Sequence, residues 1–436
     1  MSTPRVLLIT RECLRSDSNE GNVLINLFSG LPVELANIYC KPGLPDVPLC
    51  SAYFQLTDRM ALENLLRKTP MGRTVQPETA QAPALQKAER ENRRFYDFFR
   101  RYNFTLFHMS RELLWKLADF KSDALDRFVL DFAPDVVFAP QCYSKFVLAV
   151  QRYVIGLCKA PAVTYLYDDL YSLKQLRVSP LYWLDRLIQR RSIRKTLDYY
   201  RFAYTMTQQQ ADEYAKMLPI PMKVLRKCAA PPAQASPRQD GEVRFLYAGG
   251  VYYGRDKTLS AVADAVRALR ADGCAVRLDI YTSSPLSAKM AQSLDDGEGC
   301  STHAAIPYEE LTKTYRQSDV ALHVESFQRK YALLTRLSFS TKIVDCLGSG
   351  CAVLAICPAM NAGLQYLQDE DAALCLTDPR GIAKAVERLS RDAALRQSYK
   401  QKAVACLRRN HNARQVRDGL LADIRQLAKE KEVEAQ

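Results

Sequence analysis

The sequence contains no apolar run close to the ~20 residues that a membrane-spanning helix needs. Its first apolar stretch, Val6–Thr10, is too short for the core of a signal peptide, and the charged Arg11 and Glu12 follow at once. We therefore predict a cytoplasmic protein without a transmembrane segment.

Patterns that hold metals or cofactors are also missing. The 13 cysteines are spaced irregularly and include no C-x-x-C pair, and the four histidines do not lie at the spacing of metal ligands. We expect no metal and no cofactor. We interpret the cysteines as small buried side chains in a reducing compartment.

Three common site motifs are absent. No G-x-G-x-x-G follows Val6–Thr10, so a dinucleotide site is unsupported there. No G-x-x-x-x-G-K-[ST] and no G-x-S-x-G occur, which excludes a P-loop and the nucleophile elbow of the α/β-hydrolases.

The composition that remains is that of an ordinary globular protein. The 436 residues are 48% hydrophobic and 25% charged, and this length suggests two domains. Lys and Arg exceed Asp and Glu by 61 to 48, giving a net charge of +13. No recognised DNA- or RNA-binding motif accompanies that charge, so we expect no nucleic-acid partner.

The first half alternates between predicted strands and helices, which is typical of a doubly wound parallel sheet. Strand Val6–Thr10, a helix that begins between Asn19 and Asn22, and strand Leu35–Cys40 open this pattern. Residues from about 44 to 131 interrupt it, because they are polar, charged and helical in pattern, and we interpret them as a helical insertion. The elements expected afterwards are strand 135–139, helix 144–157, strand 162–167, helix 180–201, strand 202–206, helix 208–218 and strand 223–228.

A proline-rich stretch divides the chain. Residues 230–241 contain three prolines, a serine and a glycine without apolar periodicity, which indicates a linker between a first domain, 1–229, and a second, 242–409. A C-terminal helix is expected over 410–436. Strands in the second domain are expected at 243–247, 276–281, 303–306, 320–324, 352–356 and 373–376.

These patterns predict an α/β protein with two Rossmann-like domains that face each other across a cleft. The best helix of the second domain is Thr258–Arg270, with apolar residues at helical spacing. In open α/β sheets, ligands bind at the carboxyl ends of the strands. Functional residues are therefore sought there.

A glycine turn is the first candidate site. Gly249 and Gly250 end a predicted strand, and Arg255 and Lys257 precede a helix. Glycines let backbone amides approach a phosphate, and the cations would add charge. The alternative is a tight turn with surface cations.

A short helix is the second candidate. Ser340 or Thr341 is a suitable N-cap, and Lys342 and Asp345 share one helix face at a spacing of three. That pair could hold a phosphate and a sugar hydroxyl. The alternative is a capped helix with an ion pair worth a few tenths of a kcal/mol.

The second half resembles a known family at this point. The stretches Tyr308–Leu311, Ser318–Phe327 and Ser338–Ala355 are similar to the donor half of GT-B glycosyltransferases. They look most like retaining enzymes of glycosyltransferase family four in bacterial surface-polysaccharide pathways, which carry S-T-K-I-x-E-Y-L-x-x-G-x-P-[VI]-L-A here. The resemblance covers residues 243–378 well and the first half only in topology.

The resemblance implies a role for individual residues of the donor half. Lys342 and Arg255 would neutralise the diphosphate of a nucleotide sugar, and Asp345 would hold the ribose hydroxyls. The amides of Gly249 and Gly250 would meet the phosphate or sugar, and residues from Glu325 to Phe327 would border the donor.

The sequence departs from the family pattern at three places. Asp345 replaces a glutamate, and Cys351-Ala352 replaces a variable residue and a proline. Leu337 stands where many members have the first acid of a glutamate pair.

The first half would hold the acceptor. Gly21 stands where such enzymes keep a flexible glycine near the donor sugar, although it could simply belong to the start of a helix. Asp168 and Asp169 follow a predicted strand, and a carboxylate there could accept a proton from an acceptor hydroxyl. Capping of the next element is the alternative.

The helix predicted over 180–201 is basic and amphipathic. Arg186, Arg190 and Arg194 form one stripe, and leucines and an isoleucine give an apolar side. Such a helix could lie on an anionic membrane and suit a lipid-linked acceptor. A solvated outer face is the alternative.

We therefore predict a glycosyltransferase that moves a sugar from a nucleotide diphosphate sugar to a hydroxyl of a glycan or lipid-linked saccharide, as the resemblance implies. The alternatives are an inactive membrane-associated scaffold of a polysaccharide assembly complex and a GT-B-like epimerase. A phosphorylase would need a lysine that holds pyridoxal phosphate, for which no distinct motif is present.

Overall fold

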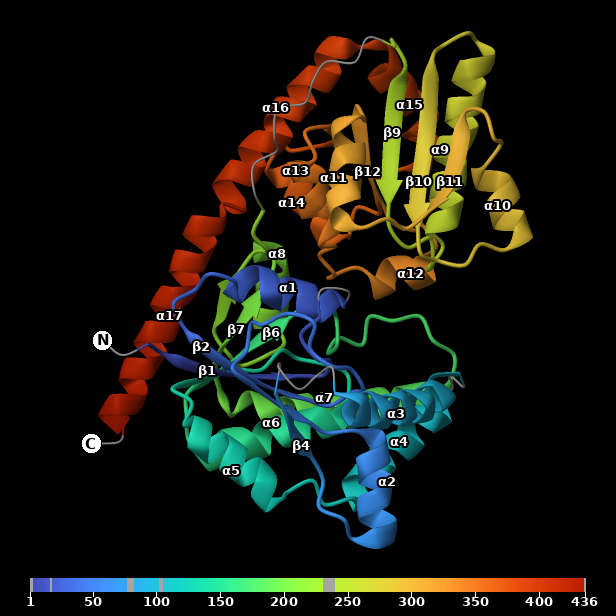
Figure 1. Cartoon of the computed structure of the whole chain (residues 1–436). Coiled ribbons are helices and arrows are strands. Elements are labelled where there is room, and N and C mark those ends of the chain that lie inside the picture. Colours follow the sequence, from blue (N-terminus) through green and yellow to red (C-terminus); the bar gives the residue numbers. More distant parts are fainter. Residues whose placement is uncertain (1–2, 16–17, 77–81, 102–104, 230–239, 435–436) are drawn as a thin grey trace. The chain divides into compact units, whose positions relative to one another are not determined.

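The computed structural model describes residues 3–15, 18–76, 82–101, 105–229 and 240–434 (Figure 1). The chain forms two compact units. The first comprises Met1–Leu173, Arg177–Leu225 and Arg417–Gln436, and the second Lys174–Leu176 and Arg226–Val416. The predicted linker lies almost wholly outside the described residues, at 230–239.

The first unit is built on an eight-stranded sheet in the order β4-β3-β2-β1-β5-β6-β7-β8. All neighbouring strands are parallel except β3 and β4, which are antiparallel. Its strands are β1 (Arg5–Thr10), β2 (Glu34–Tyr39), β3 (Ala52–Gln55), β4 (Arg73–Val75), β5 (Val136–Phe138), β6 (Ala162–Leu166), β7 (Tyr200–Thr205) and β8 (Met222–Val224).

Helices cover both faces of this sheet, with α1 on one side and α5 and α6 on the other (Figure 1). α17 joins this unit because the Asp423 carboxylate accepts hydrogen bonds of 2.6 Å from Tyr204 Oη and Lys223 Nζ. The helices are α1 (Asn19–Phe28), α2 (Asp58–Arg67), α3 (Pro83–Arg101), α4 (Thr105–Leu117), α5 (Asp123–Phe132), α6 (Lys145–Cys158), α7 (Pro180–Leu197), α8 (Gln208–Ala215) and α17 (Ala413–Glu434).

The prediction of a purely helical insertion over 44–131 is wrong. That region contributes β3 and β4 to the sheet as well as four helices. Both strands are short, and β4 has only one buried residue, Val75, so neither produces the long apolar run by which a strand is recognised in a sequence.

The second unit contains a six-stranded parallel sheet in the order β11-β10-β9-β12-β13-β14. This is the strand order of a Rossmann fold. The strands are β9 (Val243–Ala248), β10 (Val276–Thr282), β11 (Cys300–Ala304), β12 (Val320–Val324), β13 (Ala352–Ile356) and β14 (Leu374–Leu376). The helices are α9 (Arg255–Ala271), α10 (Ala288–Leu294), α11 (Tyr308–Arg316), α12 (Arg329–Leu334), α13 (Lys342–Gly348), α14 (Ala362–Asp369), α15 (Ile382–Arg391) and α16 (Ala393–Asn410), with a 3-10 turn at Pro379–Gly381.

The core of the second unit lies between its central strands and α9 and α15. β12 and β13 are buried along their whole length, as their apolar residues predict, and the one polar residue of these two strands, His323, is buried too. β11 begins three residues before the predicted start, because this edge strand carries polar residues that an apolar search overlooks. The prediction of two Rossmann-like domains is confirmed, since each unit has a doubly wound sheet.

The buried and exposed faces of α7 are the reverse of those predicted. Arg186 and Gln189 lie on its buried face, whereas Leu184, Leu187 and Ile188 are 43–52% exposed. Arg190 is half-buried against Tyr171. The expected stripe of three exposed arginines is therefore wrong, and only its last member, Arg194, is exposed.

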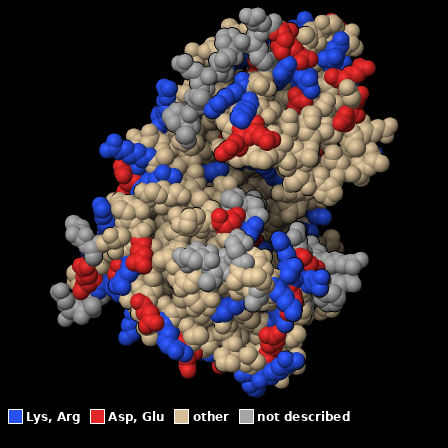
Figure 2. Space-filling view, viewed as in Figure 1, with Lys and Arg blue, Asp and Glu red and all other residues tan. Residues whose placement is uncertain are grey.

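The remaining structural expectations concern cysteines, charge and membrane spans. All 13 cysteines are free and buried or half-buried, as predicted. On the face drawn in Figure 2, basic and acidic side chains are interspersed over each unit. In the described part of the chain, no helix is both long and apolar enough to cross a membrane.

Candidate functional site

The centre of the second sheet brings the two candidate motifs together. β9 and β12 are neighbours there, and the chain leaves them in opposite directions along the sheet, so their carboxyl ends form the topological switch point. Gly249 follows β9, and Lys342 begins α13. A Cβ on Gly249 would lie 2.5 Å from Cε and 2.7 Å from Nζ of Lys342, so glycine is what admits the lysine.

The two glycines differ in the hydrogen bonds of their amides. The Gly249 N–H donates to the Tyr281 carbonyl at 2.8 Å, so this amide is already used within the sheet. The Gly250 N–H has no hydrogen-bond partner within the described part of the chain. A Cβ on Gly250 would collide with the ring of Tyr252, at 2.1 Å.

Arg255 is paired with Glu325. Its Nη2 and Nε donate to the two carboxylate oxygens at 2.7 and 3.1 Å. Burial alone would lower the pKa of Arg255, but the carboxylate raises it overall. The charge of Arg255 is therefore already compensated, and Glu325, expected only to border the donor, fixes the guanidinium.

Lys342 is the uncompensated cation of this cluster. It makes no hydrogen bond or ion pair within the described part of the chain. Burial lowers the pKa of Lys342 and the charge of Arg255 lowers it further, while Glu325 and Asp345 oppose the shift. His323 is buried in the same cluster, and burial followed by the charges of Arg255 and Lys342 lowers its pKa to about 3. An anion at Lys342 would relieve this excess of positive charge.

Asp345 is held by a partner that the sequence did not suggest. Its Oδ1 lies 3.2 Å from Nζ of Lys227, which is 118 residues away in the sequence. The ion pair between Lys342 and Asp345, which was the alternative to a binding role, is not formed. No local pattern marks Lys227 as a member of this cluster, because it lies far from the motif in sequence, whereas His323 lies two residues before Glu325.

The remaining residues of the second unit predicted to bind the donor are Thr341, Ser340 and Lys257. Thr341 is the N-cap of α13 but its side chain makes no capping bond, because its backbone is already helical at φ −58° and ψ −22°. The Ser340 carbonyl accepts from the Ile343 amide. Lys257 is exposed on the first turn of α9.

In the first unit, Gly21 is a tightly packed residue of the first turn of α1. A Cβ there would lie 2.4 Å from both the Arg15 carbonyl oxygen and Ser18 Oγ. Ser18 Oγ accepts the Gly21 amide at 3.0 Å as the N-cap of this helix. The contacts of Gly21 are therefore those of a residue that starts a helix.

The two aspartates after β6 have different environments. Asp169 is buried, and its carboxylate accepts the amide and the hydroxyl of Ser172 and lies 3.6 Å from Arg186. These contacts fit the capping alternative. The Asp168 side chain is exposed. Of the two, Asp168 alone has a carboxylate that an acceptor could reach.

Metal ligation is not indicated by these clusters. Among the residues that the structure describes, no three His, Cys, Asp or Glu side chains come together in a way that could hold a metal ion.

Comparisons with known proteins agree with this architecture. Residues 261–422 match the family model described as glycosyl transferase-like. No curated protein matches the chain.

Solved structures show the same fold over the whole chain. Sucrose-phosphate synthase from Thermosynechococcus elongatus is 14% identical, with a TM-score of 0.62 over 98% of this chain and 99% of that one. HepE from Anabaena, in complex with UDP and glucose, is 10% identical, with a TM-score of 0.61 over 97% and 100%. A UDP-forming trehalose-phosphate synthase from Burkholderia vietnamiensis is 12% identical, with a TM-score of 0.57 over 97% and 100%. The chain thus has the GT-B fold of these proteins, and the resemblance is confirmed at that level. Membership of family four stays a prediction.

Proposed function

We propose that the protein is a glycosyltransferase whose second unit binds a nucleotide diphosphate sugar. The observation that carries this proposal is Lys342, a half-buried cation whose side chain has no partner in the described chain, lying against Gly249 at the switch point of a Rossmann sheet. A diphosphate would supply the missing negative charge. The match of residues 261–422 to a glycosyl transferase-like model supports the same assignment.

The proposed reaction is a displacement at the anomeric carbon of the donor sugar. The bond between that carbon and the diphosphate oxygen breaks, and a bond to the acceptor oxygen forms. The acceptor proton passes to a base, for which Asp168 is our candidate. Lys342 stabilises the departing diphosphate, and Arg255, fixed by Glu325, adds positive potential. We propose that no metal is needed and, by the resemblance, that the anomeric configuration is retained.

UDP-glucose is the first donor to test, because UDP and glucose are bound to HepE, which has the same fold. Titration calorimetry with UDP should give binding to the wild type and a roughly 10–100-fold loss in Lys342→Met, since a hydrogen bond to a charged group is worth about 1.5–3 kcal/mol. Lys289→Met, which removes an exposed cation on α10, is the matched control.

Thermal stability distinguishes a binding role of Lys342 from a structural one. Removal of a half-buried, unpaired cation should leave the melting temperature of ligand-free Lys342→Met equal to or above that of the wild type. Unchanged UDP affinity in this variant would refute the proposal. UDP binding without hydrolysis or transfer of labelled glucose would favour the inactive scaffold.

We also propose that α7 places the enzyme on an anionic membrane that carries its acceptor. The exposed face of α7 presents Leu184, Leu187 and Ile188. Exposed apolar side chains gathered on one helix face are typical of an interaction surface. Arg191, Arg194 and Lys195 are exposed in the following turn. Apolar residues beside cations suit a bilayer with anionic headgroups.

Vesicle flotation tests this contact. The wild type should float with phosphatidylglycerol vesicles and much less with phosphatidylcholine, and the double variant Leu184→Ser/Leu187→Ser should stay in the bottom fraction of the gradient. Leu66→Ser, at an exposed leucine of α2 in the same unit, is the matched control. If the double variant floats as the wild type does, the exposed face of α7 is not the membrane contact. If the wild type is a dimer and the double variant is a monomer, the exposed face of α7 would instead contact a second copy of the chain.

A further inference from the structure

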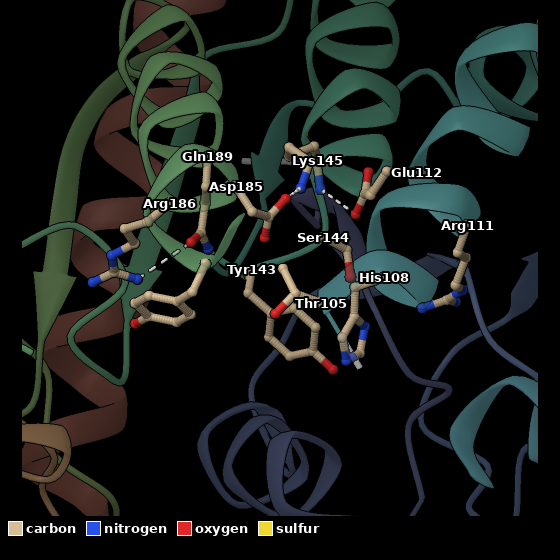
Figure 3. A pocket seen from close by; sticks show the side chains of 11 residues that line it. Thr105, His108, Arg111, Glu112, Tyr143, Ser144, Lys145, Asp185, Arg186 and Gln189 are labelled. Atoms are coloured by element: carbon tan, nitrogen blue, oxygen red, sulfur yellow. Dashed lines mark hydrogen bonds and ion pairs between the residues drawn. The ribbon is translucent and has the colours of Figure 1, made fainter. Parts of the chain in front are cut away.

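The first unit contains a cavity of about 210 Å³ that none of the predicted site residues lines. Figure 3 shows side chains from α4, α6 and α7 converging on it. The start of α6 follows β5, which pairs with β1 at the centre of the first sheet. The chain leaves β1 and β5 in opposite directions along the sheet, so the cavity lies at a topological switch point, where α/β sheets bind ligands.

The hydroxyl of Ser144 is left without a partner by an unusual helix cap. Ser144 is the N-cap of α6 but its side chain makes no capping bond. Instead, the Glu112 carboxylate accepts the amides of Lys145 and Phe146, at 3.0 Å each. Ser144 is 1% exposed, and its Oγ has no hydrogen-bond partner within the described part of the chain. A buried hydroxyl in this state costs stability, and a ligand could satisfy it.

A second unsatisfied group comes from α7. Arg186 is held by the carbonyls of Asp169 and Ser172, each at 2.9 Å, and its Nη1 donates to Gln189 Oε1 at 3.2 Å. Because Arg186 can only donate, this contact fixes the orientation of the Gln189 amide. Gln189 Nε2 is therefore a buried donor that has no partner among the described residues.

A third unsatisfied donor belongs to Arg111 on α4. Its Nε donates to the Asp58 carboxylate at 2.7 Å, while Nη2 is buried and unpartnered within the described part of the chain. Ser144, Gln189 and Arg111 all line the cavity. These three side chains are each more than nine-tenths buried, and each has one polar atom without a hydrogen bond in this part of the protein.

Each of the three cations that line the cavity faces a carboxylate. Arg111 is paired with Asp58, and Lys145 Nζ lies 2.7 Å from Asp185. Arg186 faces Asp169, and the amides at the start of α6 balance Glu112.

His108 adds no charge to this balance at neutral pH. Burial, with the nearby charge of Arg111, lowers its pKa. A phosphate or carboxylate would therefore find no uncompensated cation among the lining residues, whereas a neutral hydroxyl-rich molecule would find donors and an acceptor.

We propose that this cavity binds one neutral sugar ring of the acceptor, whose hydroxyls pair with Ser144, Gln189 and Arg111. The proposal rests on the proposed glycosyltransferase function. The volume is below the roughly 300–1,000 Å³ of pockets for drug-sized ligands, which suits a single ring. Tyr143 and Tyr182 also line the cavity, and the guanidiniums of Arg11 and Arg177 lie over their rings, at 4.1 and 5.4 Å.

Saturation-transfer NMR with methyl glycosides tests this assignment. The probes are the neutral methyl glycosides of glucose, galactose, mannose and rhamnose, with glucose 6-phosphate and glucuronic acid as charged comparators. At least one neutral glycoside should bind the wild type, and both charged sugars should bind more weakly. Ser144→Ala and Gln189→Leu should each weaken that binding about tenfold. Gln208→Leu, at an exposed glutamine of α8, is the matched control and should bind as the wild type does.

Two further measurements distinguish a loss of sugar binding from a loss of folding or of donor binding. The melting temperature of Ser144→Ala should not fall, because the hydroxyl makes no bond in the described chain. UDP affinity should be unchanged in both variants, so failure of UDP to bind the wild type would refute the proposed function alone. Binding of no neutral glycoside, stronger binding of a charged sugar, or binding that neither variant weakens would overturn the neutral-sugar site.

Discussion

The side chain of Lys342 occupies the space that a side chain at position 249 would need. An ideal Cβ on Gly249 would lie 2.5 Å from Cε of Lys342, closer than Cβ atoms are found to any neighbour. The glycine bend and the lysine are therefore one structural feature, although about half of the second unit separates them in sequence.

Gly249→Ala should displace Lys342 without removing its charge. We expect UDP affinity to fall at least tenfold, because the ammonium can no longer lie against the bend. Gly156→Ala in α6 is the matched control, since a Cβ there meets nothing within 4 Å and alanine favours a helix. Equal UDP affinities for the two variants would show that the position of Lys342 is immaterial.

Glu325→Gln should have opposite effects on stability and binding. Arg255 would lose the carboxylate that compensates it, so the free energy of unfolding should fall by about 3–5 kcal/mol. The freed guanidinium should then bind UDP more tightly. Chemical denaturation and calorimetry measure the two effects, and weaker UDP binding at unchanged protein folding would assign Glu325 a direct contact with the donor.

His323 should make stability depend on pH below its ordinary pKa. Its folded pKa is lowered to about 3, against ~6.5 when unfolded. Between these values the unfolded chain holds a proton that the folded chain does not, so stability is present above pH ~6.5 and falls as the pH falls, by up to ~1.4 kcal/mol per unit. When chemical denaturation is measured between pH 7 and 4, the free energy of unfolding of His323→Leu should depend less on pH than that of the wild type. His411, whose pKa is lowered to about 4 chiefly by burial, would leave a remaining slope.

Replacing each of the two aspartates after β6 by asparagine should have different effects on stability and on the transfer rate. Asp169→Asn removes the charge that faces buried Arg186, so stability should fall by roughly 1–3 kcal/mol. Asp168→Asn should lower the transfer rate without changing UDP affinity. A normal transfer rate in Asp168→Asn would remove it as the proposed base.

The sequence by itself determined where the principal strands lie and how they alternate with helices. Ala352–Ile356 is a continuous apolar run and Val320–Val324 is interrupted only by His323, and burial on both faces of a parallel sheet favours such runs. The glycine bend at 249 was equally visible, because a strand that ends in two glycines is a local pattern.

Only the tertiary structure decided which charges are compensated. Arg255 meets Glu325 across 70 residues and Asp345 meets Lys227 across 118, so no local spacing could have paired them. The same reason explains α7, where a regular arginine spacing predicted an outer face. Arg186 is buried because the loop after β6 supplies Asp169 and two carbonyls to it. Helical periodicity fixes which residues share a face, but the surrounding chain decides which face is covered.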